Sequence, residues 1–235
     1  MTDGKERRLI EESIPLRRER KGGAVNLILT AVLLEAARMI DDGFDVPSIE
    51  NAVYDVFQLP EGIFFSIGRF GPAKLAAVLE SYADGSDPED SLYRIYHNFF
   101  APAACLDSES EEKRLFMGPV SEILTRPMVD DPMQVDLLKA RFMGTVFMTA
   151  SEIVDSGIQD LQTLERLCRR DLGWKEGPFS MMNRIGIGEA MRIVTKKLEQ
   201  SHRKEINFPI PSLLIEQARR GEPWPLNSHA GHGNE

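Results

Sequence analysis

The sequence has 235 residues, of which 42% are hydrophobic and 28% are charged, as in ordinary globular proteins. Its 37 acidic residues outnumber 28 basic ones, and the resulting net charge of -9 repels nucleic acid phosphates and anionic membrane surfaces. This composition argues against a disordered chain, a nucleic-acid-binding protein and a protein of the membrane surface.

The cysteines and the longest uncharged stretch bear on the compartment. Cys105 and Cys168 are the only cysteines, and neither belongs to a CxxC pair, which favours a reducing, cytoplasmic setting. The stretch 22–34 is well short of the ~20 apolar residues that a membrane span needs. Residues 1–21 are too charged for a secretory signal, and their mixed charges predict a solvated arm.

Apolar residues at three- and four-residue steps predict helices in the first half of the chain. A long helix over 24–42 ends at Gly43, which supplies the left-handed residue past the last turn. A shorter helix follows from Pro47 until Pro60, because proline is tolerated in a first turn. A glycine-bearing elbow over 61–71 leads into a third helix, and residues 89–128 show only short, weaker helical patterns.

The second half shows the same order. Asp131 and Pro132 predict an N-cap and first turn of a helix that ends at Gly157. A short helix ended by Gly173, an elbow over 176–186, a helix over 187–198 and a last helix ending near Gly221 follow. The polar tail 227–235 is expected to be disordered. No segment alternates apolar and polar residues in a β-rich context, so we expect an all-α protein without a sheet.

The two elbows reveal an internal repeat. Residues 61–71 and 176–186 share five of eleven residues at a constant offset of 115. The preceding glycine stops, Gly43 and Gly157, lie at an offset of 114. The repeat predicts a first helical module with a divergent connector over 22–130 and a second module over 131–226. Residues 24–83 and 138–200 are expected to superpose as helical units about an approximate two-fold axis.

Motifs for cofactors and metals are missing from the sequence. Gly186 and Gly188 are followed by Met191 where a dinucleotide fingerprint needs its third glycine, and no phosphate loop occurs. The four histidines lack the spacing of metal ligands. We therefore assign no catalytic, cofactor-binding or metal-binding residue. Activity of the chain alone through carboxylates such as Glu35 or Glu152 remains an alternative, although both are as easily explained as exposed helix charges.

Neither the cysteines nor the methionines single out a site. Both cysteines lack a neighbouring histidine in sequence and are more often core residues than nucleophiles, and Cys168 falls on the apolar side of its helix. The methionines of both halves could line an adaptable acyl pocket, but we favour a role as gap-fillers in a helical core.

Three groups of residues carry a family resemblance. Val25-Asn26, Glu35 to Met39 with Gly43, and Pro60 to Phe64 resemble the C-terminal helical domain of 3-hydroxyacyl-CoA dehydrogenases. Residues 177–186 resemble the elbow of that module, and residues 218–225 are similar to the end of the multifunctional fatty-acid oxidation protein. The resemblance covers most of residues 22–226 and implies a duplicated module of the 6-phosphogluconate dehydrogenase C-terminal-domain-like fold.

The resemblance also implies a function divided between two chains. In the family, NAD and the catalytic histidine belong to a Rossmann domain, for which this sequence has no counterpart. Asn26 matches an asparagine near the substrate and is our candidate acyl-CoA-binding residue, whereas Leu27 replaces the arginine that follows it in the family.

Two hypotheses follow. The chain is a stand-alone helical subunit, a monomer or homodimer, that gives a substrate-side wall and assembly surface to a separate NAD-binding chain in fatty acyl-CoA β-oxidation. Alternatively, it is a non-catalytic helical scaffold that has lost dehydrogenase function. In neither case do we expect this chain alone to bind a cofactor or to act as an oxidoreductase.

Overall fold

The computed structural model describes residues 24–59, 62–63, 132–203 and 211–226. These ranges contain seven helices and no strand, which confirms the all-α prediction for the described part of the chain. Within it, no helix is both long enough and apolar enough to cross a bilayer. The charged arm, the helices expected over 72–128, the Asp131 cap and the polar tail all lie outside the described residues.

Helix α2, Ala24–Asp41, is buried on all sides, as expected for a sequence that is apolar almost throughout. It ends where the sequence predicted. Gly43 has a φ of 86°, its N–H donates to Ile40 O at 2.8 Å, and the Phe44 N–H donates to Met39 O at 3.0 Å. This is the Schellman arrangement, in which a left-handed glycine lets two late amides satisfy the last carbonyls of the helix.

Helix α10, Pro132–Asp155, ends in the same way. Gly157 has a φ of 69°, its N–H donates to Val154 O at 3.0 Å, and the Ile158 N–H donates to Ile153 O at 3.1 Å. Every donor and acceptor in this stop lies 114 residues after its counterpart at the end of α2. The repeat in the sequence is therefore accompanied by a repeat in the hydrogen bonds that end α2 and α10.

The next helix of each half begins at an aspartate. Asp45 caps α3, Val46–Phe57, by accepting from the Ser48 N–H at 2.9 Å. Asp160 caps α11, Leu161–Asp171, by accepting from the Thr163 N–H at 2.9 Å. The caps lie 115 residues apart, so the one-residue difference between the two offsets arises in the loop between the glycine stop and the aspartate. Pro47 lies in the first turn of α3, as predicted.

The second elbow differs from our expectation. Residues 176–186 were expected to form a glycine-bearing elbow without a helix, but α12, Pro178–Ile185, occupies most of it. Gly177 is its N-cap and Pro178 its first residue, a position where the missing proline N–H costs nothing. Of the first elbow, only residues 62–63 are described.

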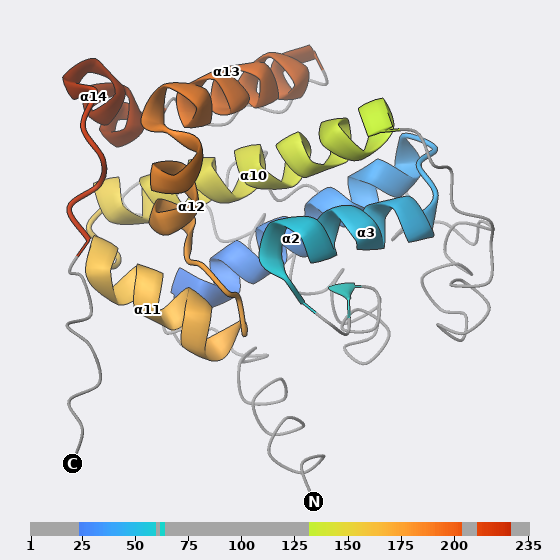
Figure 1. The fold of residues 1–235 in the computed structure, drawn as a ribbon, viewed down its shortest axis with the longest axis horizontal. Coiled ribbons are helices and arrows are strands. Elements are labelled where there is room, and N and C mark those ends of the chain that lie inside the picture. The colour runs from blue at the N-terminus through green and yellow to red at the C-terminus, as the bar shows by residue number, and fades with distance from the viewer. Residues whose placement is uncertain (1–23, 60–61, 64–131, 204–210, 227–235) are drawn as a thin grey trace, which may run out of the picture.

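The remaining helices complete a layered arrangement around α10 (Figure 1). Helix α13, Ile187–Arg203, packs on one side of α10, and α2 and α3 pack on the other. Helices α2 and α10 run in opposite directions, while α11 reaches across to α2, and α14, Ser212–Arg220, closes one end against α10 and α13. Aromatic rings join the halves, since Phe57 of α3 stacks on Trp174 with 4.3 Å between ring centroids.

Candidate functional site

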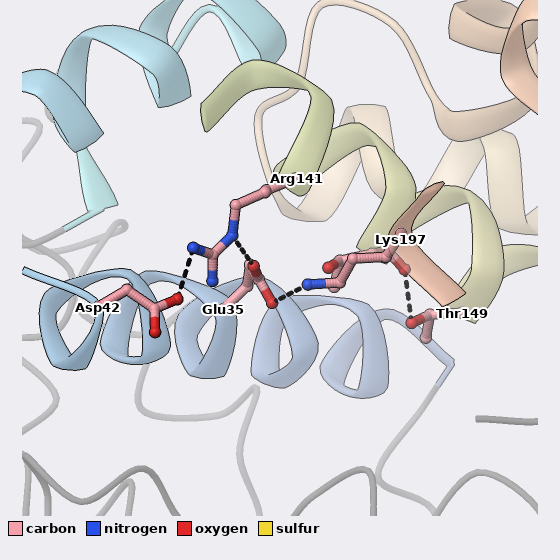
Figure 2. Close-up of polar contacts among 6 residues, drawn as sticks. Glu35, Asp42, Arg141, Thr149 and Lys197 are labelled. Atoms are coloured by element: carbon pink, nitrogen blue, oxygen red, sulfur yellow. Dashed lines mark hydrogen bonds and ion pairs between the residues drawn. The ribbon is translucent and has the colours of Figure 1, made fainter. Parts of the chain in front are cut away.

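A cluster of buried charges joins three helices near the middle of the described fold (Figure 2). Glu35 of α2 has a side chain with 0% exposure. Its Oε1 accepts a hydrogen bond from Arg141 Nε of α10 at 2.6 Å, and its Oε2 accepts one from Lys197 Nζ of α13 at 2.5 Å. Arg141 Nη1 also donates to Asp42 Oδ2 at 2.7 Å. We call Glu35, Arg141 and Lys197 the central charge cluster.

Helix geometry explains how these side chains meet. Asp42 directly follows α2 and is seven residues, about two turns, after Glu35, so both side chains lie on the same side and reach Arg141. Gly144 of α10 makes room for Lys197, because a Cβ at this glycine would lie 2.9 Å from Lys197 Cβ. The missing side chain thus lets α13 approach α10 closely enough for the lysine to reach across to α2.

The electrostatics of the cluster centre on Glu35. Burial by itself would raise the pKa of its carboxyl, but Lys197 and Arg141, with a smaller contribution from Arg38, lower it to about 2. Burial lowers the pKa of Lys197 to about 8, because its attraction to Glu35 is partly offset by repulsion from Arg141 and Arg38. Glu35 is therefore firmly ionised at neutral pH.

The central charge cluster is suited to holding the three helices together and not to proton transfer. Each Glu35 oxygen is already bound to a cation, and the Arg141 and Lys197 side chains are only 10% and 7% exposed. A general acid or base needs a face open to its substrate. The cluster instead offers directional, charge-assisted hydrogen bonds that tie α2 to α10 and α13.

A second buried carboxylate holds the elbow of the second half. Glu165 of α11 accepts from the N–H groups of Gly177 and Phe179, both at 3.0 Å, and of Ser180 at 3.3 Å. These amides belong to the first turn of α12, which has no other side-chain cap. A Cβ at Gly177 would collide with the carboxylate, so this glycine lets the carboxylate reach the amides.

The first half repeats this carboxylate. Glu50 of α3 accepts from the Ile63 N–H at 2.7 Å, and a Cβ at Gly62 would collide with its carboxylate. Glu50 and Glu165 are 115 residues apart, as are Gly62 and Gly177. Neither glutamate was predicted from the sequence, although a glutamate occurs twelve residues before each elbow glycine.

Asn26, the candidate substrate residue, lies in the first turn of α2 and is 7% exposed. It is nine residues from Glu35, about two and a half turns, so the two side chains leave opposite sides of the helix. The structure therefore does not bring Asn26 into the central charge cluster.

The carboxylates that we took for exposed helix charges are buried. Glu35 and Glu152 both have 0% exposure, because α2 and α10 are interior helices. Glu35 and Arg38 both lie among the apolar residues of α2, and charges at such positions signal buried partners. The partners themselves, Arg141 and Lys197, carry no such signal and were not identified from the sequence.

Cys168 and several methionines belong to the core. Cys168 is fully buried, as its position on the apolar side of its helix predicted, and burial raises the pKa of its thiol. Met148, Met181 and Met182 are also part of the core, in agreement with the gap-filling role, whereas Met133 is exposed and does not fill a gap in the core. Cys105 lies outside the described residues.

Few features of the described surface point to a ligand. A depression of about 230 Å³ beside α11 is lined by residues that include Thr163, Glu165, Arg166, Arg169 and Ser180. Its walls carry both signs of charge, so charge alone does not select a ligand class. No group of three or more metal-ligating side chains occurs in the described ranges.

Comparisons with protein-family models, curated proteins and solved structures found no match to the chain.

Proposed function

We propose that this chain is the helical subunit of a two-component 3-hydroxyacyl-CoA dehydrogenase of fatty acyl-CoA metabolism. In this proposal a separate Rossmann-domain chain carries NAD and the catalytic histidine. The helical chain supplies one wall of the acyl-CoA cleft and the surface on which the NAD-binding chain assembles. Dehydrogenase activity then requires both polypeptides.

The observation that carries the proposal is the repetition of one local design. Each half has a helix with a Schellman stop, an aspartate-capped shorter helix, and an elbow whose glycine admits a glutamate carboxylate to backbone amides. A glycine after the first helix, followed by a glycine-bearing elbow, is also the order of motifs in the family that the sequence resembles. The repetition supports a duplicated module of the 6-phosphogluconate dehydrogenase C-terminal-domain-like fold.

The experiment is reconstitution of activity. The chain, purified alone and in complex with a co-purifying NAD-binding chain, is assayed for NADH formation with 3-hydroxyacyl-CoA and titrated with NAD and with acyl-CoA by calorimetry. We expect turnover and NAD binding only from the complex, because the sequence contains no GxGxxG fingerprint with which a helix N-terminus could bind a pyrophosphate. Micromolar NAD affinity or turnover by the isolated chain would contradict the proposal.

Asn26 tests the substrate side of the proposal. If the asparagine faces bound substrate in the complex, Asn26→Ala lowers reconstituted kcat/KM by ~10-fold or more, the effect of about 1.4 kcal/mol lost in the transition state. The folding of the chain changes little in that case. A fall in melting temperature with unchanged reconstituted activity would assign Asn26 to the helical core instead.

A second candidate function is a non-catalytic helical scaffold for protein association. The observations that favour it are the burial of Asn26 and of the central charge cluster, because buried side chains stabilise the fold and are closed to a ligand. Acyl-CoA titration separates the two candidates. A scaffold that has lost dehydrogenase function gives no binding heat with acyl-CoA, either alone or in its complex.

A further inference from the structure

The depression beside α11 lies where three segments of the second half meet. One side of it comes from α11, and the others come from Ser180 in the first turn of α12 and from Leu226, which follows α14. Its volume of about 230 Å³ is below the roughly 300–1,000 Å³ that is usual for sites of drug-sized ligands. The depression therefore suits a small ligand or one group of a larger ligand.

Two arginines that line the depression have no partner among the described residues. Arg166 and Arg169 are exposed, and neither makes a hydrogen bond or an ion pair within the described ranges. The next residue along α11, Arg170, pairs instead with Asp171. Because Arg166 and Arg169 are three residues apart on a helix, they are neighbours on its surface. Two positive charges are thus available side by side at the depression.

Glu165 is the only acidic residue in the described lining, and its charge is already engaged. Its Oε1 accepts from the Gly177 N–H, and its Oε2 accepts from the N–H groups of Phe179 and Ser180. The first turn of a helix carries about half an elementary positive charge, which these amides direct at the carboxylate. The positive charge of the two arginines is therefore only partly offset within the depression.

The carboxylate contact at the elbow does not require these arginines. In the first half, Glu50 makes the corresponding contact, 115 residues before Glu165. At the same offset, Asn51 stands in place of Arg166 and Tyr54 in place of Arg169. The first half thus holds its glutamate against a backbone amide with no cation at either position. The two arginines are an addition of the second half and need a role of their own.

We propose that this depression binds the phosphate group of a small phosphorylated ligand, with Arg166 and Arg169 as its cationic residues. A phosphate monoester carries a charge of about −1.5 to −2 at pH 7, which two guanidinium groups balance. A single carboxylate would balance only one of them. The planar forks of N–H donors on arginine also match phosphate oxygens, and the Ser180 hydroxyl can donate from the α12 side. This site goes beyond the dehydrogenase proposal and does not depend on it.

The probe for the site is inorganic phosphate, titrated calorimetrically into the whole chain, with chloride at the same ionic strength as the reference. The test variant is Arg166→Gln/Arg169→Gln. The matched control is Arg219→Gln/Arg220→Gln, which removes two exposed arginines from the last turn of α14 and lowers the net charge by the same amount. Circular dichroism and thermal unfolding establish whether each variant is folded.

The wild-type chain and the control should bind phosphate with similar affinity, and the test variant should bind it at least ~10-fold more weakly, because two charge-assisted contacts are lost. Absence of saturable phosphate binding by the wild-type chain overturns the proposal. An equal loss in test variant and control overturns it as well, because net charge alone would then explain the binding. A test variant that does not fold also overturns it, since the arginines would then stabilise the fold.

The source of the phosphate is identified with coenzyme A and its form without the 3′-phosphate. If the wild-type chain prefers complete coenzyme A and the test variant does not, the ligand is an acyl-CoA and the site belongs to the proposed function. If neither form is preferred while inorganic phosphate still binds through Arg166 and Arg169, the phosphate site stands with another small phosphorylated ligand. The two proposals can therefore fail separately.

Discussion

Removing the charge of Glu35 alone should be among the most damaging single changes in the described fold. Glu35→Gln keeps the shape of the side chain but leaves Arg141 and Lys197 buried without their shared anion. The lowering of the Glu35 pKa by Lys197 and Arg141 means that the ionised form of the carboxyl stabilises the folded chain. Removing one partner of a buried ion pair costs about 3–5 kcal/mol in general, and we expect a loss of this size here.

The assay is urea unfolding followed by circular dichroism, with thermal unfolding alongside. A loss of about 3–5 kcal/mol corresponds to a melting temperature lower by roughly 6–20 °C for a chain of this size. The matched control is Glu189→Gln, which removes the partner of Arg192 from an exposed pair and should cost less than about 1 kcal/mol. If the two variants lose the same stability, the assignment of Glu35 as the anion of a buried cluster is wrong.

The same carboxylate sets the acid limit of the wild-type protein. Because the pKa of Glu35 is lower in the folded chain than in the unfolded chain, its contribution is fully present above pH 4.5 and is lost as the pH falls towards 2. Glu35→Gln has no such group. The difference in unfolding free energy between wild-type and variant should therefore shrink over this range, and a difference that stays constant would refute the argument.

Three further outcomes follow from the described contacts. Gly144→Ala should destabilise the chain by about 1–3 kcal/mol, because the new Cβ meets Lys197. The control Gly188→Ala, which has open space around the new Cβ, should be neutral or stabilising by up to about 1 kcal/mol. Thermal unfolding of both variants checks this. Glu165→Ala should cost at least about 1–3 kcal/mol by leaving buried amides of α12 without an acceptor, measurable in urea, and an unchanged midpoint would contradict the role of this carboxylate. Cys168 should resist a thiol reagent at pH 8 until the chain unfolds, because burial raises its pKa; rapid labelling of the folded chain would show that the thiol is accessible.

Local features of the fold could be predicted from sequence because each depends on few neighbouring residues. Gly43 and Gly157 were recognised as helix stops because only glycine adopts the left-handed conformation there without cost. Pro47 marked a first helical turn, and the spacing of apolar residues gave the helical character of both halves. The α12 helix was missed because it has only eight residues, of which Ser180 and Asn183 are weak helix formers, and because its first-turn amides are capped by Glu165 from another helix.

The sequence by itself determined where helices start and stop and that two segments share one pattern, because these depend on backbone conformation and on repetition along the chain. Only the tertiary structure decided which charges are buried and what they bind. Glu35 and Lys197 are 162 residues apart, and no local rule connects them. Their contact exists because α2, α10 and α13 pack together. The missing side chain of Gly144 leaves room for Lys197 between α10 and α13. The low dielectric of the interior then favours an arrangement in which each buried charge has a partner.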